Sequence, residues 1–214
     1  MKKMKIPRPT LDEELRFLQL GYDFVAGLDE VGRGAFAGPI VAASVILPFN
    51  FSALHELNDS KLLSKKKRQY LSELIKEKAV HFSIVEVPVS YINKYGIGKA
   101  NQLALFKATQ QLSKNMNQEK KTYYLIDGFI IKKISKFRQK AIIHGDKLSA
   151  SIAAASIIAK VYRDTYMEKI SQEYQNYSFN LHKGYGTKLH RMAIQEYGLS
   201  DIHRTSFKLS KYLS

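Results

Sequence analysis

The sequence contains no cysteine. Disulfide bonds and thiolate metal sites are therefore excluded, and any bound metal must be held by oxygen or imidazole ligands. Oxygen ligands favour magnesium or manganese. The chain also lacks a long apolar run, because the nearest candidate, residues 151–159, is too short and too rich in alanine and serine to cross a bilayer.

The first ten residues, MKKMKIPRPT, carry the positive charges of a signal peptide without an apolar segment behind them. We therefore expect a soluble, cytoplasmic protein. Acidic residues are also scarce, since 19 Asp and Glu stand against 34 Lys and Arg, for a formal net charge of +15. Such a basic chain typically binds a polyanion, most often nucleic acid, although lysine enrichment from biased codon usage would give the same count.

The 214 residues, 45% of them hydrophobic, suffice for one compact domain with a small appendage. The hydrophobic patterns predict five strands, at 24–30, 40–47, 81–87, 122–127 and 141–144. The longer helices are expected at 11–20, 64–78, 99–116, 147–174 and 188–197. Three successive strands followed by strands separated by helices predict an α/β domain with a mixed five-stranded sheet, flanked by helices and extended by C-terminal helices.

The most informative stretch is GLDEVGRGAFAG at residues 27–38. Asp29 and Glu30 follow an apolar run, where carboxylates are costly to desolvate unless a positive charge meets them. The glycines around Arg33 allow a backbone or a phosphate to approach where a Cβ would obstruct it. Carboxylates beside a Gly-Arg-Gly turn therefore suggest a divalent cation held next to a phosphate.

Asp29 and Glu30 are adjacent, and adjacent residues of a regular strand point to opposite faces. Either the strand ends between them, which Gly32 and Gly34 make plausible, or Glu30 acts from the rim of the site. In both cases we expect Asp29 to be the central metal ligand.

Two further acids stand at junctions between predicted elements. Asp127 ends the fourth strand, and Asp146 begins the longest helix beside the end of the fifth. Sites on open α/β sheets form outside strand ends, so these acids can meet Asp29 and hold two divalent cations about 3.5–4 Å apart. Asp164 lies about 27 Å further along the same helix, so we expect it to be structural.

Other polar residues have ordinary structural explanations. A single aspartate at the end of a strand is usually a turn or cap residue, and we expect this of Asp59 and Asp201. Three histidines, His144, His182 and His203, are individually expected to be structural.

Tyr185 stands between two glycines, in a turn where an aromatic ring buries little unless it meets a partner. The ring either stacks on a sugar or base or plugs the edge of the core, and the local sequence favours neither. Basic residues gather at 65–68, where an external anion or a solvated face fits equally well, and again at 132–140. Lys61 follows a possible Asp-Ser turn that would hold it in one place.

A set of motifs in this chain resembles the ribonuclease HII family in its bacterial form. They are DEVGRG at 29–34, GPIVAA at 38–43, NDSKLL at 58–63, IDG at 126–128, GDKLSASIAAASIIAKVYRD at 145–164, HKGYGTKLH at 182–190 and IHRTSF at 202–207. The resemblance runs over residues 25–207 with the motifs in the order of the family. One such motif is weakly specific, whereas the whole set in register is highly specific.

The resemblance implies a ribonuclease H-like fold and a metal-dependent endonuclease that cleaves the RNA strand of RNA–DNA hybrids and incises duplex DNA at single ribonucleotides. The acidic positions of the family fall on Asp29, Glu30, Asp127 and Asp146, which would be catalytic and would hold two Mg²⁺ or Mn²⁺ ions. The substrate-binding positions fall on Gly32, Arg33, Gly34, Lys61 and Tyr185.

Three expectations follow for the organisation and the reaction. We divide the chain into an N-terminal helical extension (1–22), a ribonuclease H-like catalytic domain (23–175) and a C-terminal helical substrate-binding extension (176–214). Incision 5′ to the ribonucleotide, leaving a 3′-hydroxyl and a 5′-phosphate, is the hypothesis for the chemistry. We expect a monomer that binds hybrids and ribonucleotide-containing duplex DNA and does not bind membranes.

Three other classes fit parts of the sequence. The related ribonuclease HIII usually carries an additional N-terminal domain and differs after the acidic pair. A non-catalytic nucleic-acid-binding protein would explain the charge but not acids placed against a substrate of their own sign. Another metal nuclease on the same fold would keep the acids but would not need the Gly-Arg-Gly turn together with Tyr185.

Overall fold

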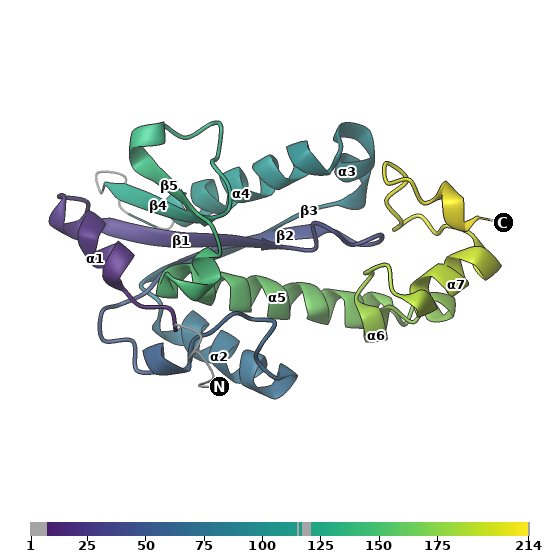
Figure 1. Cartoon of the computed structure of the whole chain (residues 1–214), viewed down its shortest axis with the longest axis horizontal. Helices are drawn as coiled ribbons and strands as arrows, with labels where there is room; N and C mark the ends of the chain where they lie inside the picture. Colours follow the sequence, from purple (N-terminus) through teal and green to yellow (C-terminus); the bar gives the residue numbers. More distant parts are fainter. Residues whose placement is uncertain (1–7, 115, 117–120, 214) are drawn as a thin grey trace, which may run out of the picture.

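The structure is a computed structural model that describes residues 8–114, 116 and 121–213. A mixed sheet lies at its centre, covered by α4 on one face and by α5 on the other, with α2 packed outside α5 (Figure 1). The strands are β1 (Phe24–Val31), β2 (Ile40–Ile46), β3 (His81–Val87), β4 (Thr122–Asp127) and β5 (Gln139–Ile142). The helices are α1 (Asp12–Gln19), α2 (Lys65–Lys78), α3 (Val89–Tyr95), α4 (Ile97–Lys114), α5 (Ala150–Ile170), α6 (Phe179–His182) and α7 (Lys188–Tyr197).

The strand order is β3-β2-β1-β4-β5, which confirms the mixed five-stranded sheet. The first three strands are antiparallel, and β4 and β5 run parallel to β1. The long α4 lies between β3 and β4 because a parallel strand can be reached only by a crossover connection.

The register of β1 leaves part of one edge open. Its pairing with β4 ends at Leu28, opposite Ile126, whereas its pairing with β2 continues to Val31. The last three residues of β1 are therefore held by β2 on one side and lie beyond β4 on the other.

The small residues at the start of α5 let this helix approach β1 very closely. A Cβ added to Gly27 would lie 2.1 Å from the backbone carbon of Ser151, so the helix and the strand meet at backbone distance. Ser149 begins the helix by accepting a hydrogen bond from the Ile152 N–H. Close packing of these small residues fixes the first turns of α5 beside the end of β1.

Most element boundaries agree with the sequence predictions to within two residues, and three differences bear on the site. β5 starts two residues before the predicted Ala141 and ends at Ile142. α5 begins only at Ala150, so Asp146 lies in a separate 3₁₀ turn, Gly145–Lys147, and not in the first turn of the helix. β1 continues through Val31, so of the two alternatives for its adjacent acids, a strand that ends between them is wrong.

The C-terminal segment packs on the far end of α5 through a cluster of Ala37, Met167, Tyr177, Phe179 and Ala193 (Figure 1). Isolated β-bridges join Ala35 to Tyr185 and Ala37 to His203. The turn after α6 is thereby held against the loop that connects β1 and β2. The division of the chain into three regions stays a prediction. Within the described residues, no helix is long and apolar enough to span a membrane.

Candidate active site

A polar cavity of about 540 Å³ opens where β1 and β4 end. Its lining brings together all nine residues predicted from the sequence to act in catalysis or substrate binding: Asp29, Glu30, Gly32, Arg33, Gly34, Lys61, Asp127, Asp146 and Tyr185. Four lining residues were not predicted: Val31, Ser60, Ser156 and Lys160. Segments far apart in the sequence thus meet at one place, as expected for the strand ends of an α/β sheet.

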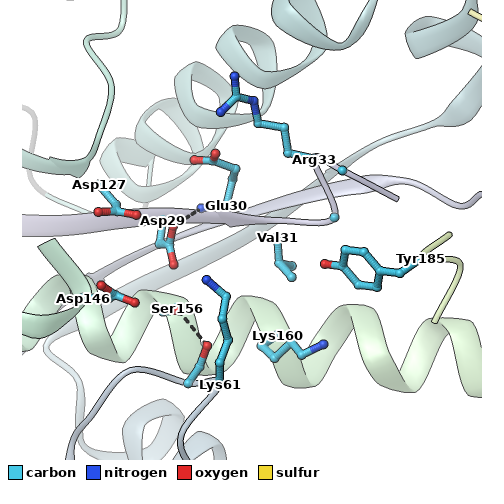
Figure 2. A pocket seen from close by; sticks show the side chains of 13 residues that line it. Asp29, Glu30, Val31, Arg33, Lys61, Asp127, Asp146, Ser156, Lys160 and Tyr185 are labelled. Carbon is cyan, nitrogen blue, oxygen red and sulfur yellow. Dashed lines mark hydrogen bonds between the residues drawn. The ribbon is translucent and has the colours of Figure 1, made fainter. Parts of the chain in front are cut away.

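The two adjacent acids of β1 point to opposite faces of the strand. Asp29 is directed toward α5 and Glu30 toward α4, with Asp127 beside them (Figure 2). Both nevertheless line the cavity, because β4 ends at Asp127 and leaves this edge of β1 uncovered. A regular strand therefore delivers both carboxylates to one site across its open edge.

Burial and the charges of neighbouring carboxylates raise the pKa values of both acids on β1. The pKa of Asp29 is raised well above its ordinary value, first by burial and then by the charge of Glu30, whereas a hydrogen bond from Ser156 opposes the shift. The pKa of Glu30 is raised to about 7 by burial and then by Asp127, against the opposing charges of Arg33 and Lys61. Crowded carboxylates of this kind favour any cation that can join them.

Asp146 is positioned through the neighbouring glycine. The Gly145 N–H donates to Asp127 Oδ1 at 2.7 Å, which ties the 3₁₀ turn to the end of β4. Burial raises the pKa of Asp146, followed by the charges of Asp59 and Asp127. The hydrogen bond between Gly145 and Asp127 therefore fixes Asp146 relative to the end of β4.

The donor set fits hard divalent cations. Glu30 Oε2 is buried without a hydrogen-bond partner. Among the described residues, no side-chain nitrogen of a lysine or arginine lies within 4.0 Å of a carboxylate oxygen of Asp29, Glu30, Asp127 or Asp146. Carboxylate oxygens are the ligands that Mg²⁺ and Mn²⁺ prefer. In the described part of the chain no three acidic or histidine side chains converge on one point at ligand distances, so the carboxylates are distributed along the cavity.

The two glycines of the Gly-Arg-Gly turn have different structural reasons. Gly32 has a φ of +90°, and a Cβ there would lie 2.2 Å from Arg163 Nε, so a protein side chain occupies the space beside it. A Cβ on Gly34 would have no neighbouring atom within 4 Å, so the space beside it is open. Arg33 lies between them with its guanidinium 4.6 Å from the Phe129 ring centroid. Of the two glycines, only Gly34 leaves room for a substrate to approach.

Lys61 is held by the expected turn. Asp59 Oδ1 accepts from the Lys61 N–H at 2.9 Å, and Ser60 Oγ lies 3.0 Å from Ser156 Oγ on α5. The Lys61 side chain extends from this turn toward the carboxylates (Figure 2). Asp59 therefore acts as a turn residue, as expected from the sequence.

Ser156 and Lys160 are absent from the sequence prediction, although their spacing could have pointed to them. They stand four residues apart on α5 and therefore share one face of the helix. Lys160 Nζ donates to Asp164 Oδ1 at 2.8 Å and lies 5.6 Å from the Tyr185 ring. Asp164 is thus structural, as expected. The Tyr185 hydroxyl points into the cavity (Figure 2), and its contact with a substrate stays a prediction.

The histidines of the C-terminal segment form a buried cluster away from the cavity lining. His182 stacks on His190 with ring centroids 4.4 Å apart, and His190 Nε2 lies 3.0 Å from His203 Nε2. The expected structural role of His182 and His203 agrees with this packing. Asp201 accepts from the Tyr174 hydroxyl at 2.5 Å, which also agrees with a structural role.

The basic cluster at 65–68 is largely paired within the protein. Lys65 contacts Glu168 at 2.7 Å, Lys67 contacts Glu56, and Arg68 donates to the Ser60 carbonyl at 2.9 Å. In the second cluster, Lys140 pairs with Glu13 at 2.7 Å. Binding of duplex phosphates by these clusters stays a prediction.

Comparison with known proteins agrees with this geometry. The family model described as ribonuclease HII matches residues 26–210. Ribonuclease HII of Desulfotalea psychrophila is 43% identical over 204 residues, which cover 95% of this chain and 89% of the relative. Ribonuclease HII of Clostridium beijerinckii is 46% identical over 195 residues, which cover 90% of this chain and 70% of the relative.

Solved structures show the same fold. Bst-RNase HIII in complex with Mn²⁺ has a TM-score of 0.72 at 22% identity, over 91% of this chain and 70% of that one. Ribonuclease H2 from Pyrococcus horikoshii OT3 has a TM-score of 0.69 at 23% identity, over 87% of this chain and 95% of that one. The predicted ribonuclease H-like fold is therefore confirmed.

Proposed function

Because this chain belongs to the ribonuclease HII family and is an endoribonuclease of the ribonuclease H class, we propose that it also incises duplex DNA on the 5′ side of a single embedded ribonucleotide. The RNA strand of an RNA–DNA hybrid is the substrate that the family membership supports directly. The products of incision would be a 3′-hydroxyl and a 5′-phosphate. Such an activity would serve the removal of ribonucleotides from DNA.

The observation that carries the proposal is the shared cavity. Four carboxylates, the open face of Gly34 and the Tyr185 hydroxyl line one continuous space. Since the 2′-hydroxyl alone marks a ribonucleotide within DNA, an enzyme that finds one must read this group beside its reaction centre. Tyr185 would make that contact, while the backbone near Gly34 approaches the sugar–phosphate chain.

We assign the cation ligands from the positions of the acids. Asp29, which is buried and lies beside Asp127 and Asp146 (Figure 2), would contact both cations, with Asp127 completing one position and Asp146 the other. Glu30 would assist from the opposite face of β1. Bound Mg²⁺ or Mn²⁺ would lower the pKa of the attacking water and neutralise charge on the leaving oxygen.

The basic side chains at the cavity would place the substrate. Lys61 extends from its turn toward the carboxylates, where its ammonium can contact a phosphate next to the scissile bond. Arg33 and Lys160 also line the cavity. Affinity that depends on such phosphate contacts falls steeply with increasing salt.

The test is a cleavage assay on an end-labelled DNA duplex that contains one ribonucleotide. An all-DNA duplex and a hybrid of one RNA strand with one DNA strand serve as controls, each with Mg²⁺, Mn²⁺ or chelator. We expect a metal-dependent nick 5′ to the ribonucleotide and none in the all-DNA duplex. Cleavage of the hybrid alone would reject the single-ribonucleotide activity and the role of Tyr185 in sensing the junction. We also propose that the protein is a monomer in the cytoplasm. Analytical sedimentation would test the monomeric state, and cell fractionation would test the location.

A further inference from the structure

Two arginines near the cavity are completely buried. Arg163 on α5 and Arg204 in the C-terminal segment are both 0% exposed. No carboxylate of the described residues lies within 4.0 Å of either guanidinium. Burial lowers the pKa of both groups, that of Arg204 to about 9. Burying a cation without an anion is costly unless other groups solvate it.

Backbone carbonyls solvate Arg163. Its Nε donates to the Pro39 carbonyl at 2.9 Å and its Nη2 to the Ala37 carbonyl at 3.0 Å, both in the loop between β1 and β2. Its Nη1 donates to the Lys183 carbonyl at 2.9 Å, in the turn that carries Tyr185. One side chain therefore binds the two segments that would read the substrate.

Arg204 binds the same loop through other carbonyls as well as that of Pro39. Its Nε and Nη2 donate to the Gly38 carbonyl at 3.0 and 2.8 Å, and Nη2 also reaches the Pro39 carbonyl at 3.1 Å. Its Nη1 donates to the carbonyl of Arg33 at 3.1 Å, within the Gly-Arg-Gly turn itself. An apolar side chain could fill this volume but would leave these buried carbonyls without donors.

Arg163 also contacts the recognition residues directly. Its guanidinium carbon lies 5.4 Å from the centroid of the Tyr185 ring. It occupies the space that a Cβ on Gly32 would need. Tyr185 and the Gly-Arg-Gly turn are thus both packed against one guanidinium. The Phe36 N–H also donates to the Gly184 carbonyl at 2.8 Å, which joins the loop after β1 to the turn that carries Tyr185.

We propose that Arg163 and Arg204 are positioning residues, which fix Tyr185 relative to the Gly-Arg-Gly turn and so determine how strongly the enzyme prefers a DNA–RNA junction. This inference rests on the proposed single-ribonucleotide activity. The two arginines do not touch the substrate. They act by holding the backbone that does, because a planar guanidinium can bind several carbonyls in one fixed arrangement whereas an ammonium cannot.

The experiment compares Arg163→Lys and Arg204→Lys with the wild-type enzyme. For each variant we would measure kcat/KM on a DNA duplex with one ribonucleotide and on an RNA–DNA hybrid. The affinity for Mg²⁺ would be measured by calorimetry, and Tm by thermal unfolding. We expect kcat/KM on the single ribonucleotide to fall about tenfold to a hundredfold more than on the hybrid, with Mg²⁺ affinity unchanged. Arg163→Gln and Arg204→Gln, which keep two donors without the charge, replace any lysine variant that does not fold.

The matched control is Leu112→Ala, which truncates a buried side chain on α4 that does not line the cavity. We expect it to lower Tm without changing the ratio of kcat/KM on the two substrates. If the arginine variants lower Tm and leave that ratio at the wild-type value, the arginines are only structural and the inference is wrong. If the wild-type enzyme itself does not incise at a single ribonucleotide, the proposed function fails instead.

Discussion

Two groups of charged side chains lie near the Gly-Arg-Gly turn, the carboxylates of the cavity and the buried guanidiniums of Arg163 and Arg204, and they differ in how their charge is compensated. The carboxylates at the ends of β1 and β4 repel one another, and no cationic side chain of the described residues lies within 4.0 Å of them. The guanidiniums of Arg163 and Arg204 also lack ion-pair partners among the described residues, but backbone carbonyls of the protein surround them. The carboxylates therefore favour binding of an external cation, whereas backbone carbonyls of the protein already hydrogen-bond the guanidiniums.

Under the proposed function, the first group would serve the reaction and the second would serve substrate recognition. Carboxylates without a neighbouring cationic side chain are suited to bind metal cations, and groups with shifted pKa values are typical of reaction centres. Cations that are fully hydrogen-bonded are suited to hold a loop in one conformation. Asp29, Glu30 and Asp127 stand on the neighbouring strands β1 and β4, whereas the arginines bind the loop after β1, where their hydrogen bonds add to isolated β-bridges in fixing the backbone.

The largest expected effect is on the acidic group. Asp127→Asn removes one charge with little change of shape, and it should lower kcat in Mg²⁺ about 10³-fold or more, since a cation contributes several kcal/mol and each 1.36 kcal/mol is a factor of ten. Tm without metal should not fall, because repulsion with Asp29 and Glu30 is relieved. Full activity of this variant would refute the ligand assignment.

Substitutions of the two glycines should give opposite results. Gly32→Ala places a methyl group against Arg163 at a φ of +90°, and should destabilise the fold by about 2–4 kcal/mol. Gly34→Ala meets no neighbour, and should change the free energy of unfolding by less than about 0.5 kcal/mol while lowering kcat/KM. Chemical denaturation and the cleavage assay check both. Equal destabilisation by the two variants would contradict the division between a packed and an open glycine.

Divalent cations should stabilise the protein through the acidic group. Mg²⁺ at about 100 times its Kd would add about 2.7 kcal/mol, which corresponds to a rise in Tm of roughly 5–10 °C for a chain of this size. Asp29→Asn should lose most of this rise, whereas Arg204→Lys should keep it. Thermal unfolding with Mg²⁺ and with chelator makes the measurement, and an undiminished rise in the Asp29 variant would exclude that residue as a ligand.

The stability of the fold should also depend on pH, without any change in the sequence. Burial lowers the pKa of His190 to about 3 and that of His203 to about 4, from an ordinary value of 6.5. The unfolded chain therefore binds more protons below pH 6.5, so the stability that these neutral histidines contribute is lost as pH falls from about 6.5 toward 4. The loss should approach about 1.4 kcal/mol per pH unit for each histidine.

The acidic group should respond in the opposite direction. The pKa of Glu30 is raised from 4.5 to about 7, so the folded state binds the extra proton and its contribution to stability weakens as pH rises from 4.5 toward 7. Urea unfolding of His203→Gln and Glu30→Gln between pH 4.5 and 8 would separate the two components. A histidine variant with the same acid slope as the wild-type protein would show that the cluster does not titrate as described.

Local patterns in the sequence were enough to predict the class of fold and most of the residues that line the cavity. Hydrophobic periodicity and turn residues located the strands, because each of these signals lies within a few neighbouring residues. The motifs predicted nine of the residues that line the cavity, and four further lining residues were not predicted. The chemical types of these residues already indicated oxygen-ligated cations beside a phosphate.

The arrangement of these residues depends on contacts between distant segments and became visible only in the folded chain. The register of β1 against β4 opens one edge, so Asp29 and Glu30 reach the same cavity from opposite faces, which strand alternation alone argued against. Neighbours distant in sequence decide that Gly32 is packed and Gly34 open. Long-range contacts also place Lys160 in the cavity and Arg163 beside Tyr185, since the face that a helix presents depends on what it packs against.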